Sequence, residues 1–217
     1  MRMLDLFCGR GGWTNAFLDR GWECVGVDIV RHPDYRGIFI QANVLTLTEE
    51  YLSGFDFICA SSPCEQFSVH GMKHFHPDPP YPSLGIALFE YTRHICKASG
   101  VPHVMENVRA TQSFVGKADH RCGPFYLWGN AVPALMPQGI NKGTGKTGPG
   151  GDGRRSQRES ESARRLRFPA TIPPELANCV AEYAERLLEE SCKKAPPHLL
   201  TLDTAVDIVN GTGGNYA

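Results

Sequence analysis

The sequence predicts an α/β fold with a single domain, in which helices pack on both sides of a mostly parallel sheet. Three observations predict it. Short apolar runs alternate with helix-length segments along most of the chain. The first run leads into a glycine-rich turn, CGRGGW at 8–13. Asp28 ends the second run about twenty residues later, and this arrangement is typical of Rossmann-like, doubly wound sheets.

Each element follows from this alternation. We expect strands at 1–7, 23–30, 37–44, 55–61, 103–108 and 124–129. We expect helices at 14–20, 84–99 and 172–191. In the second helix, apolar residues recur at a helical period and predict one apolar side, made of Leu84, Ala87, Leu88, Tyr91, Ile95 and Cys96 or Ala98. Pro173 and Pro174 suit the first turn of the third helix.

The composition changes between 137 and 163, where Gly, Ser and charged residues replace apolar ones. We therefore expect one domain made of 1–136 and 164–192, a flexible basic loop at 137–163, and a peripheral tail at 193–217. Residues 141–167 hold eight Lys and Arg against three Asp and Glu, a local excess of five positive charges. Two interpretations stay open, a solvated loop or a segment that contacts phosphates.

The bulk composition excludes several classes of protein. The net charge is −1, so no overall basicity indicates nucleic acid. We see no secretory signal at the N-terminus and no apolar stretch of about 18 residues, the length of a membrane span. We therefore expect a cytoplasmic protein whose eight cysteines are reduced, with no membrane partner. An isolated cysteine is then a candidate nucleophile.

The glycine-rich turn favours a ligand that approaches the backbone closely. Gly9 and Gly11 fit the dinucleotide-binding pattern, but Thr14 stands where its third glycine would be. Asp28 can accept hydrogen bonds from two ribose hydroxyls. Because the turn lacks the Lys and Ser or Thr of a phosphate-binding loop, an adenosine ligand without polyphosphate fits better. The alternative is a tight turn with a surface aspartate.

Cys64 follows the fourth predicted strand in the segment SSPCEQFS, at 61–68. Pro63 stiffens the turn and limits the directions in which the thiol can point, as a nucleophile requires. The alternative is a buried structural cysteine. His70, His74 and His76 follow, but they lack the spacing of a metal site, so we expect no metal.

Glu106 ends the fifth predicted strand, among Val104, Met105 and Val108. Partial desolvation there would raise the pKa of the carboxyl and keep a proton available near neutral pH. The alternative is a glutamate that caps the next turn.

Together the segments DLFCGRGGW, VGVDI, SSPCEQFS and MENV resemble the cytosine-C5 DNA methyltransferases, which use S-adenosyl-L-methionine on a class I methyltransferase fold. The resemblance covers roughly residues 3–130 and the helix at 172–188, and it is similar to compact phage and bacterial forms without a full target-recognition domain. It implies a cytoplasmic enzyme of DNA methylation, for which restriction–modification and evasion of host defence are both open.

The resemblance implies site residues. Those implied for the cofactor are Phe7, Gly9, Gly11, Gly12, Trp13, Asp28, Asn43 and Pro63. Those implied for the substrate are Ser68, Asn107, Arg154, Arg155 and Arg165. Cys64 would add to carbon 6 of cytosine, and Glu106 would assist at N3. Arg121 is the candidate for the cytosine carbonyl, with Arg109, Arg164, Arg165 and Arg167 as rivals.

The expected substrate is DNA, either a duplex with a flipped base or a single strand. Nothing the size of a recognition domain fits between 130 and 172, so we expect a short or relaxed target sequence. Two alternatives stay open: the same chemistry on cytosine in RNA or a free nucleotide, and a catalytically silent nucleic-acid-binding module. The sequence does not predict the oligomeric state.

Overall fold

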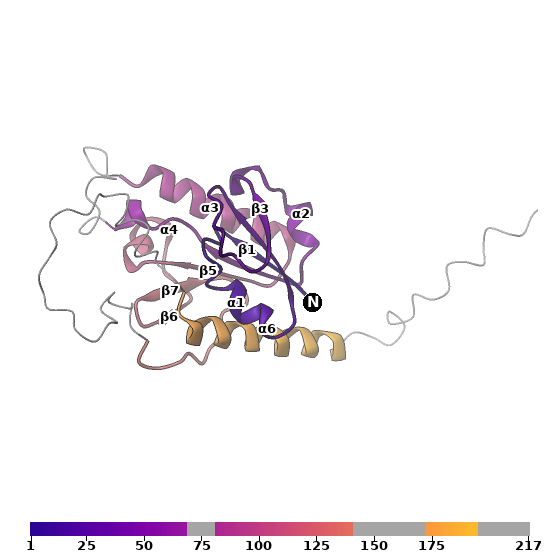
Figure 1. Ribbon diagram of the computed structural model, residues 1–217. Helices are drawn as coiled ribbons and strands as arrows, with labels where there is room; N and C mark the ends of the chain where they lie inside the picture. Colours follow the sequence, from indigo (N-terminus) through magenta and orange to yellow (C-terminus); the bar gives the residue numbers. More distant parts are fainter. Residues whose placement is uncertain (69–80, 141–171, 195–217) are drawn as a thin grey trace, which may run out of the picture. The chain divides into compact units, whose positions relative to one another are not determined.

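Seven strands form one sheet in the order β3-β2-β1-β4-β5-β7-β6 in the computed structural model, which describes residues 1–68, 81–140 and 172–194 (Figure 1). The first five strands in the chain pair in parallel. They are β1 (Arg2–Leu6), β2 (Glu23–Asp28), β3 (Ile38–Gln41), β4 (Phe57–Ser61) and β5 (His103–Asn107). The predicted α/β fold with a mostly parallel sheet is confirmed.

Helices cover both faces of this sheet (Figure 1). On one side lie α2 (Glu49–Ser53) and α3 (Ser83–Ser99), which pack on a core that includes Leu4, Ile58 and Met105. On the other side lie α1 (Thr14–Leu18) and the first part of α6 (Pro174–Lys194). The short elements η1 (Val44–Thr46), η2 (Glu65–Phe67), η4 (Arg109–Thr111) and α4 (Gln112–Val115) sit in the connections.

The sheet ends in a hairpin that the sequence predicted only in part. The sixth predicted strand is β7 (Phe125–Trp128), which pairs antiparallel with β5. The preceding strand, β6 (His120–Cys122), was not predicted because three residues give too short a pattern. It pairs antiparallel with β7 and forms the edge of the sheet. As a result β5 is an interior strand.

The predicted apolar side of α3 is not buried at its first turns. Leu84 is 55% exposed and Ala87 is also exposed. The buried residues include the predicted Ile95 and Cys96, together with Gly85, Phe89 and Thr92, which were not predicted. At Gly85 the helix approaches the connection after β4 so closely that a Cβ atom would lie 3.0 Å from the ring of Phe67. Glycine, which has no side chain, permits this contact.

The chain divides into two units, Met1–Ala184 and Glu185–Ala217. The first contains the whole sheet. Of the second, the structure describes only the last part of α6, up to Lys194. The predicted boundaries at 136, 163 and 192 stay predictions. Within the described ranges, the helices are all too short or too polar to cross a membrane.

Candidate functional site

Four of the predicted site features lie at, or directly after, the ends of parallel strands at one edge of the sheet. Because β1, β2, β4 and β5 run in parallel, their carboxyl ends meet there, and open α/β sheets bind ligands at this edge. The glycine-rich turn follows β1, Asp28 ends β2, Cys64 follows β4, and Glu106 is the second-last residue of β5.

The glycine-rich turn has an unusual backbone. Phe7 has a φ of 57°, a conformation that few residues other than glycine adopt, and Gly9 and Gly11 have φ values of 49° and 80°. The amide of Gly9 donates a hydrogen bond of 3.0 Å to Oδ2 of Asp28. The other oxygen, Oδ1, accepts from the amide of Val30 at 2.9 Å. Each carboxylate oxygen keeps a second lone pair, so Asp28 can still accept from a ligand.

Trp13 holds this turn against the sheet. Its side chain is only 1% exposed, and its indole Nε1 donates to Oγ of Ser61 at 2.9 Å. This hydrogen bond ties the turn after β1 to the end of β4. The predicted role of Trp13 in binding the cofactor stays a prediction.

The Cys64 turn is fixed at both ends. The carbonyl of Cys64 accepts hydrogen bonds from the amide of Phe67 at 3.1 Å and from the hydroxyl of Ser68 at 3.0 Å. Phe67 is fully buried, and the amide of Gly85 on α3 donates to the side chain of Gln66 at 2.7 Å. Pro63 is exposed. The thiol therefore sits on a short, well-supported turn.

Cys64 differs from most other cysteines in its surroundings. Cys8, Cys24, Cys59, Cys96 and Cys122 are buried, whereas Cys64 is half-buried. Burial raises the pKa of Cys24 and of Cys96 to about 12, so these two sulfurs stay protonated and unreactive. Among the cysteines next to the carboxyl edge of the sheet, Cys64 is the accessible one.

Glu106 lies on the strand next to the one that carries Cys64. In the parallel ladder Glu106 pairs with Ser61, three residues before Cys64, and on its other side it pairs with Leu127 of β7. Its side chain is half-buried. Neighbouring strands are about 4.8 Å apart, so the carboxyl and the Cys64 turn leave the sheet side by side.

Asn107 joins these two strands from inside. Its side chain is 1% exposed. Its amide nitrogen donates to the carbonyl and to Oγ of Ser62, both at 3.0 Å. Its amide oxygen accepts from the amide of Val108 and from the hydroxyl of Thr111, both at 2.8 Å. With both ends engaged, Asn107 links the end of β5 to the segment that leads into the Cys64 turn, and its predicted role in binding substrate stays a prediction.

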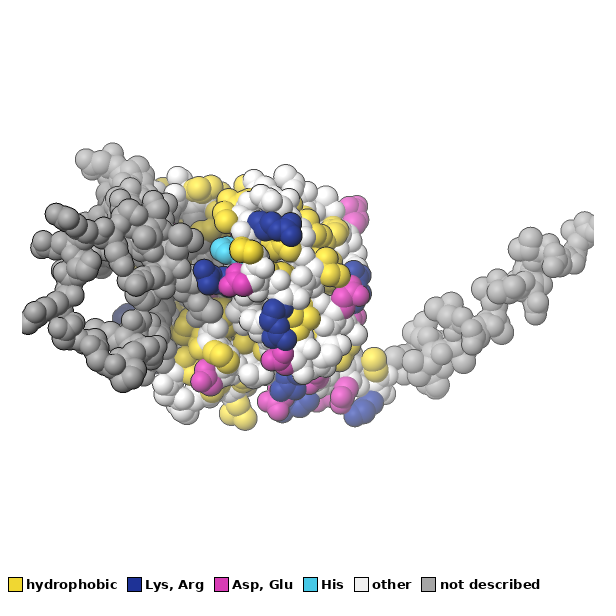
Figure 2. All heavy atoms as spheres, in the orientation of Figure 1, with side chains coloured by type: hydrophobic (Ala, Val, Ile, Leu, Met, Phe, Trp, Pro, Cys, Tyr) yellow, Lys and Arg dark blue, Asp and Glu magenta, His cyan; other side chains and the backbone are white. Residues whose placement is uncertain are grey.

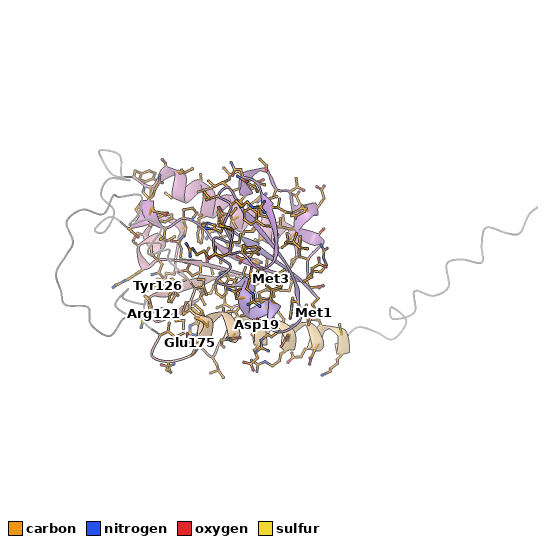
Figure 3. All side chains as sticks on the ribbon, viewed as in Figure 1. Met1, Met3, Asp19, Arg121, Tyr126 and Glu175 are labelled. Carbon is orange, nitrogen blue, oxygen red and sulfur yellow. The ribbon has the colours of Figure 1, made fainter. Side chains whose placement is uncertain are left out.

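Arg121 lies away from Glu106. It is exposed on β6, where it pairs with Tyr126, and Tyr126 pairs with Asn107 (Figure 3). Paired residues share a face of the sheet and successive residues alternate. Arg121 therefore belongs to the face opposite Glu106, and the structure does not bring the two together. Arg109, exposed on η4 three residues after Glu106, is closer along the chain.

Comparison with known proteins assigns this arrangement to a family. The family model of the C-5 cytosine-specific DNA methylases matches residues 1–118, which is more than half of the chain. The chain belongs to the C-5 cytosine-specific DNA methylase family. The match includes the glycine-rich turn, the Cys64 turn and Glu106, so the predicted family is confirmed.

One curated relative matches half of this chain. The chain is 29% identical over 115 residues to the type II methyltransferase M.HhaI of Haemophilus parahaemolyticus, which is 50% of this chain and 34% of that protein. The chain thus spans about a third of the length of this curated relative.

Solved structures give partial overlaps. The DNMT2 mutant of Spodoptera frugiperda is 23% identical with a TM-score of 0.36, over 52% of this chain and 37% of that one. The Dnmt2 methyltransferase of S. pombe is 16% identical with a TM-score of 0.37, over 54% of this chain and 37% of that one.

The roles predicted for the remaining site residues stay predictions. Asn43 is exposed, and its side-chain oxygen accepts from the amide of Leu45 at 3.0 Å, so it caps η1 while this oxygen keeps a second lone pair for a donor such as an amine. Gly12 is half-buried beside Ile172. The basic residues Arg154, Arg155 and Arg165, and the histidines at 70, 74 and 76, lie outside the described residues.

Asp5 is a residue of the site region that the sequence analysis missed. It is 1% exposed within β1, and its carboxylate accepts from the hydroxyl of Thr14 at 2.7 Å and from the amide of Thr14 at 3.3 Å. The same hydroxyl lies 2.7 Å from that of Tyr35. Burial raises the pKa of Asp5 to about 7, although the bonds from Thr14 lower it. The available signal was an acid inside an apolar run, LDLF.

We expect Asp5→Asn to weaken the pH dependence of stability. Asp5 has a pKa of about 7 in the folded chain and an ordinary value of 3.8, so the folded state binds more protons between these values. Stability should therefore fall as the pH rises from about 4 to about 7, by up to roughly 4 kcal/mol for such a difference. Urea unfolding at pH 5 and pH 8 measures this fall in both proteins.

The control for Asp5→Asn is Asp56→Asn, which changes an exposed aspartate at the other end of the sheet. If Asp5→Asn and the parent lose the same stability between the two pH values, Asp5 does not titrate in this range and the assignment is wrong.

We expect Asn107→Ala to loosen the Cys64 turn. The change leaves the buried carbonyl and hydroxyl of Ser62 without their donor, which should cost about 1–3 kcal/mol of unfolding free energy. It should also lower kcat more than it raises KM, because the turn no longer holds the thiol in place. Urea unfolding and steady-state kinetics measure both effects. Thr111→Val removes one bond to Asn107 but leaves Ser62 paired, and should have the smaller effect on kcat.

Proposed function

We propose that this protein transfers a methyl group from S-adenosyl-L-methionine to carbon 5 of cytosine in DNA. One observation carries the proposal: a half-buried cysteine on a supported turn and a half-buried glutamate leave neighbouring parallel strands, and the buried Asn107 cross-links those strands. Membership of the C-5 cytosine-specific DNA methylase family supports the choice of base and of reaction.

The residues at the carboxyl edge fit the proposed methyl donor. The positive φ angles of Phe7, Gly9 and Gly11 bend the backbone so that a ligand can approach the turn closely. Asp28 is fixed by two backbone amides and keeps lone pairs for ribose hydroxyls. The side-chain oxygen of Asn43 would accept a hydrogen bond from the adenine amine. Gly12 and Pro63 would complete the lining of the cofactor site. When bound, S-adenosyl-L-methionine supplies an electrophilic methyl group on a sulfonium.

The chemistry uses the two half-buried groups in turn. The thiolate of Cys64 attacks carbon 6 of cytosine and forms a carbon–sulfur bond, while Glu106 gives a proton to N3. Carbon 5 becomes enamine-like and takes the methyl group. A base then removes the proton from carbon 5, the carbon–sulfur bond breaks, and N3 returns its proton to Glu106. Glu106 thus stabilises charge that develops only during addition.

The covalent step gives the experiment that tests this function. The full chain is incubated with labelled S-adenosyl-L-methionine and duplex DNA, and 5-methylcytosine is scored. DNA that contains 5-fluorocytosine should trap an adduct at Cys64, because fluorine cannot leave as a proton. Methylation with no trapped adduct would show a different mechanism. The absence of both methylation and adduct would overturn the proposal.

The same assay separates the possible substrates. Parallel reactions contain single-stranded DNA, tRNA or dCMP in place of duplex DNA. A cytosine inside a duplex must flip out before Cys64 can reach carbon 6, whereas an unpaired cytosine need not. We propose DNA with a short or relaxed target sequence, because the basic residues of 141–167 suit phosphate contacts rather than base reading. Sequencing of methylated random DNA measures that preference.

Arg109 and Arg121 compete for the contact with the cytosine carbonyl. We expect Arg109→Ala to lower kcat/KM by about tenfold or more, as loss of one charged hydrogen bond would, and Arg121→Ala to have a smaller effect. The reason is that Arg109 lies only three residues after Glu106, whereas Arg121 lies on the other face of the sheet. Equal kcat/KM for the parent and Arg109→Ala would return the role to Arg121 or to the arginines at 164–167.

A further inference from the structure

A second site lies at the other end of β5, away from Cys64. An open cleft of about 350 Å³ is bordered by α3, the start of β5, the connection before β6 and the end of β7. Its lining includes Lys97, His103, Lys117, Asp119 and Asn130. Because β5 enters the sheet at His103 and leaves it at Asn107, this cleft is at the edge opposite the proposed catalytic groups.

His103 is a buried histidine among the residues that line the cleft. The residue is 2% exposed. Its ring Nδ1 lies 3.0 Å from the carbonyl of Val101, which can only accept, so Nδ1 carries the hydrogen. Burial lowers the pKa of His103, so the ring is neutral at pH 7 and Nε2 has a free lone pair. Within the described ranges no hydrogen bond to Nε2 occurs.

The rim of the cleft is cationic. Lys97 and Lys117 are exposed, and neither forms an ion pair with any other described residue. Arg93 also lines the cleft, but its guanidinium is bound to Glu90 and to the carbonyl of Val115. Asp119 uses one oxygen to accept from the amide of Gly129. By contrast, the described part of the face in Figure 2 shows acidic and basic side chains intermixed.

The groups around the cleft define the chemistry of its ligand. Two free ammonium groups and the amide nitrogen of Asn130 are donors, and they suit the oxygens of a phosphate. Nε2 of His103 and the second oxygen of Asp119 are acceptors, and they suit hydroxyl groups. A volume of about 350 Å³ lies within the usual range for small-molecule sites. We propose that this cleft binds a hydroxyl-bearing phosphate monoester, of the class of sugar phosphates and nucleotides.

Binding is tested on the full chain without any methyl transfer, so the result is independent of the proposed function. Isothermal calorimetry is run with ribose 5-phosphate, inorganic phosphate, ribose and dCMP, with sodium chloride added to equal ionic strength. We expect ribose 5-phosphate to bind more tightly than inorganic phosphate, and ribose alone not to bind. Binding of dCMP that the cleft variants described below also weaken would indicate a nucleotide, and binding of ribose 5-phosphate alone would indicate a sugar phosphate. Inorganic phosphate as tight as ribose 5-phosphate would contradict the hydroxyl contacts.

Variants place the ligand in the cleft. Lys97→Gln with Lys117→Gln removes both free cations from exposed positions and should weaken binding of ribose 5-phosphate by at least about tenfold. Lys193→Gln, an exposed lysine that does not line the cleft, is the matched control and should leave binding unchanged. NMR of the His103 ring adds a direct readout, since the Nε2 signal should shift on binding. Equal affinity in the double variant and the parent, or no binding by either, would overturn the proposal.

Discussion

Cys64→Ser is expected to abolish both methyl transfer and the trapped adduct with 5-fluorocytosine DNA. A serine hydroxyl is a far weaker nucleophile than a thiolate, and Cys64 is the half-buried cysteine at the carboxyl edge of the sheet. Loss of a nucleophile that acts with a partner group typically lowers kcat by several orders of magnitude, so we expect a fall of at least about 10³-fold. Labelled methyl transfer and gel analysis of the adduct measure the two effects.

Two controls make this result specific to Cys64. Cys192→Ser changes an exposed cysteine in the last part of α6 and should retain full activity. Urea unfolding of Cys64→Ser should match the parent, because the change is nearly isosteric and the Cys64 carbonyl keeps its hydrogen bonds from Phe67 and Ser68. A well-folded Cys64→Ser protein whose turnover falls by less than this expected factor would refute the covalent route.

Glu106→Gln is expected to slow the reaction by about 10²–10⁴-fold, the usual contribution of general acid–base catalysis. Glutamine keeps the shape of the side chain and can still donate a hydrogen bond to the ring, but it cannot pass a proton to N3. The loss should therefore appear mainly in kcat, with a smaller change in the KM for DNA. Single-turnover kinetics separates binding from chemistry.

The control for Glu106→Gln is Glu175→Gln, which changes an exposed glutamate in the first turn of α6. It should leave kcat unchanged. A Glu106→Gln protein that forms the 5-fluorocytosine adduct at the parental rate would show that addition does not need a proton at N3, and Glu106 would then have no acid role.

The sequence predicted the sheet well where strands are long and apolar. It located β1, β2, β4 and β5 because each is a buried run that ends in a turn or in a polar residue. It missed β6, which has three residues and gains its order from pairing with β7. It also misplaced the buried side of α3, because Gly85 and Thr92 face the core although neither residue type indicates burial.

The sequence also located the candidate catalytic pair but not its supports. Cys64 and Glu106 stand out locally, as a cysteine after a proline and an acid at the end of an apolar run. The bonds from Trp13 to Ser61 and from Asn107 to Ser62 join residues 45 or more positions apart, and no local pattern reports such a contact. For the same reason, tertiary pairing alone shows that Arg121 shares a face with Asn107 rather than Glu106.

The position of β5 inside the sheet affects how the protein opens. With β4 on one side and β7 on the other, β5 has no free edge, and fraying begins at β3 and β6, which lie at the two borders. Amide hydrogens at the base of Glu106 should then exchange with solvent only in the rarest openings. Glu106 therefore belongs to one of the last parts of the protein to unfold. Partial unfolding at the borders of the sheet leaves its position next to β4 unchanged.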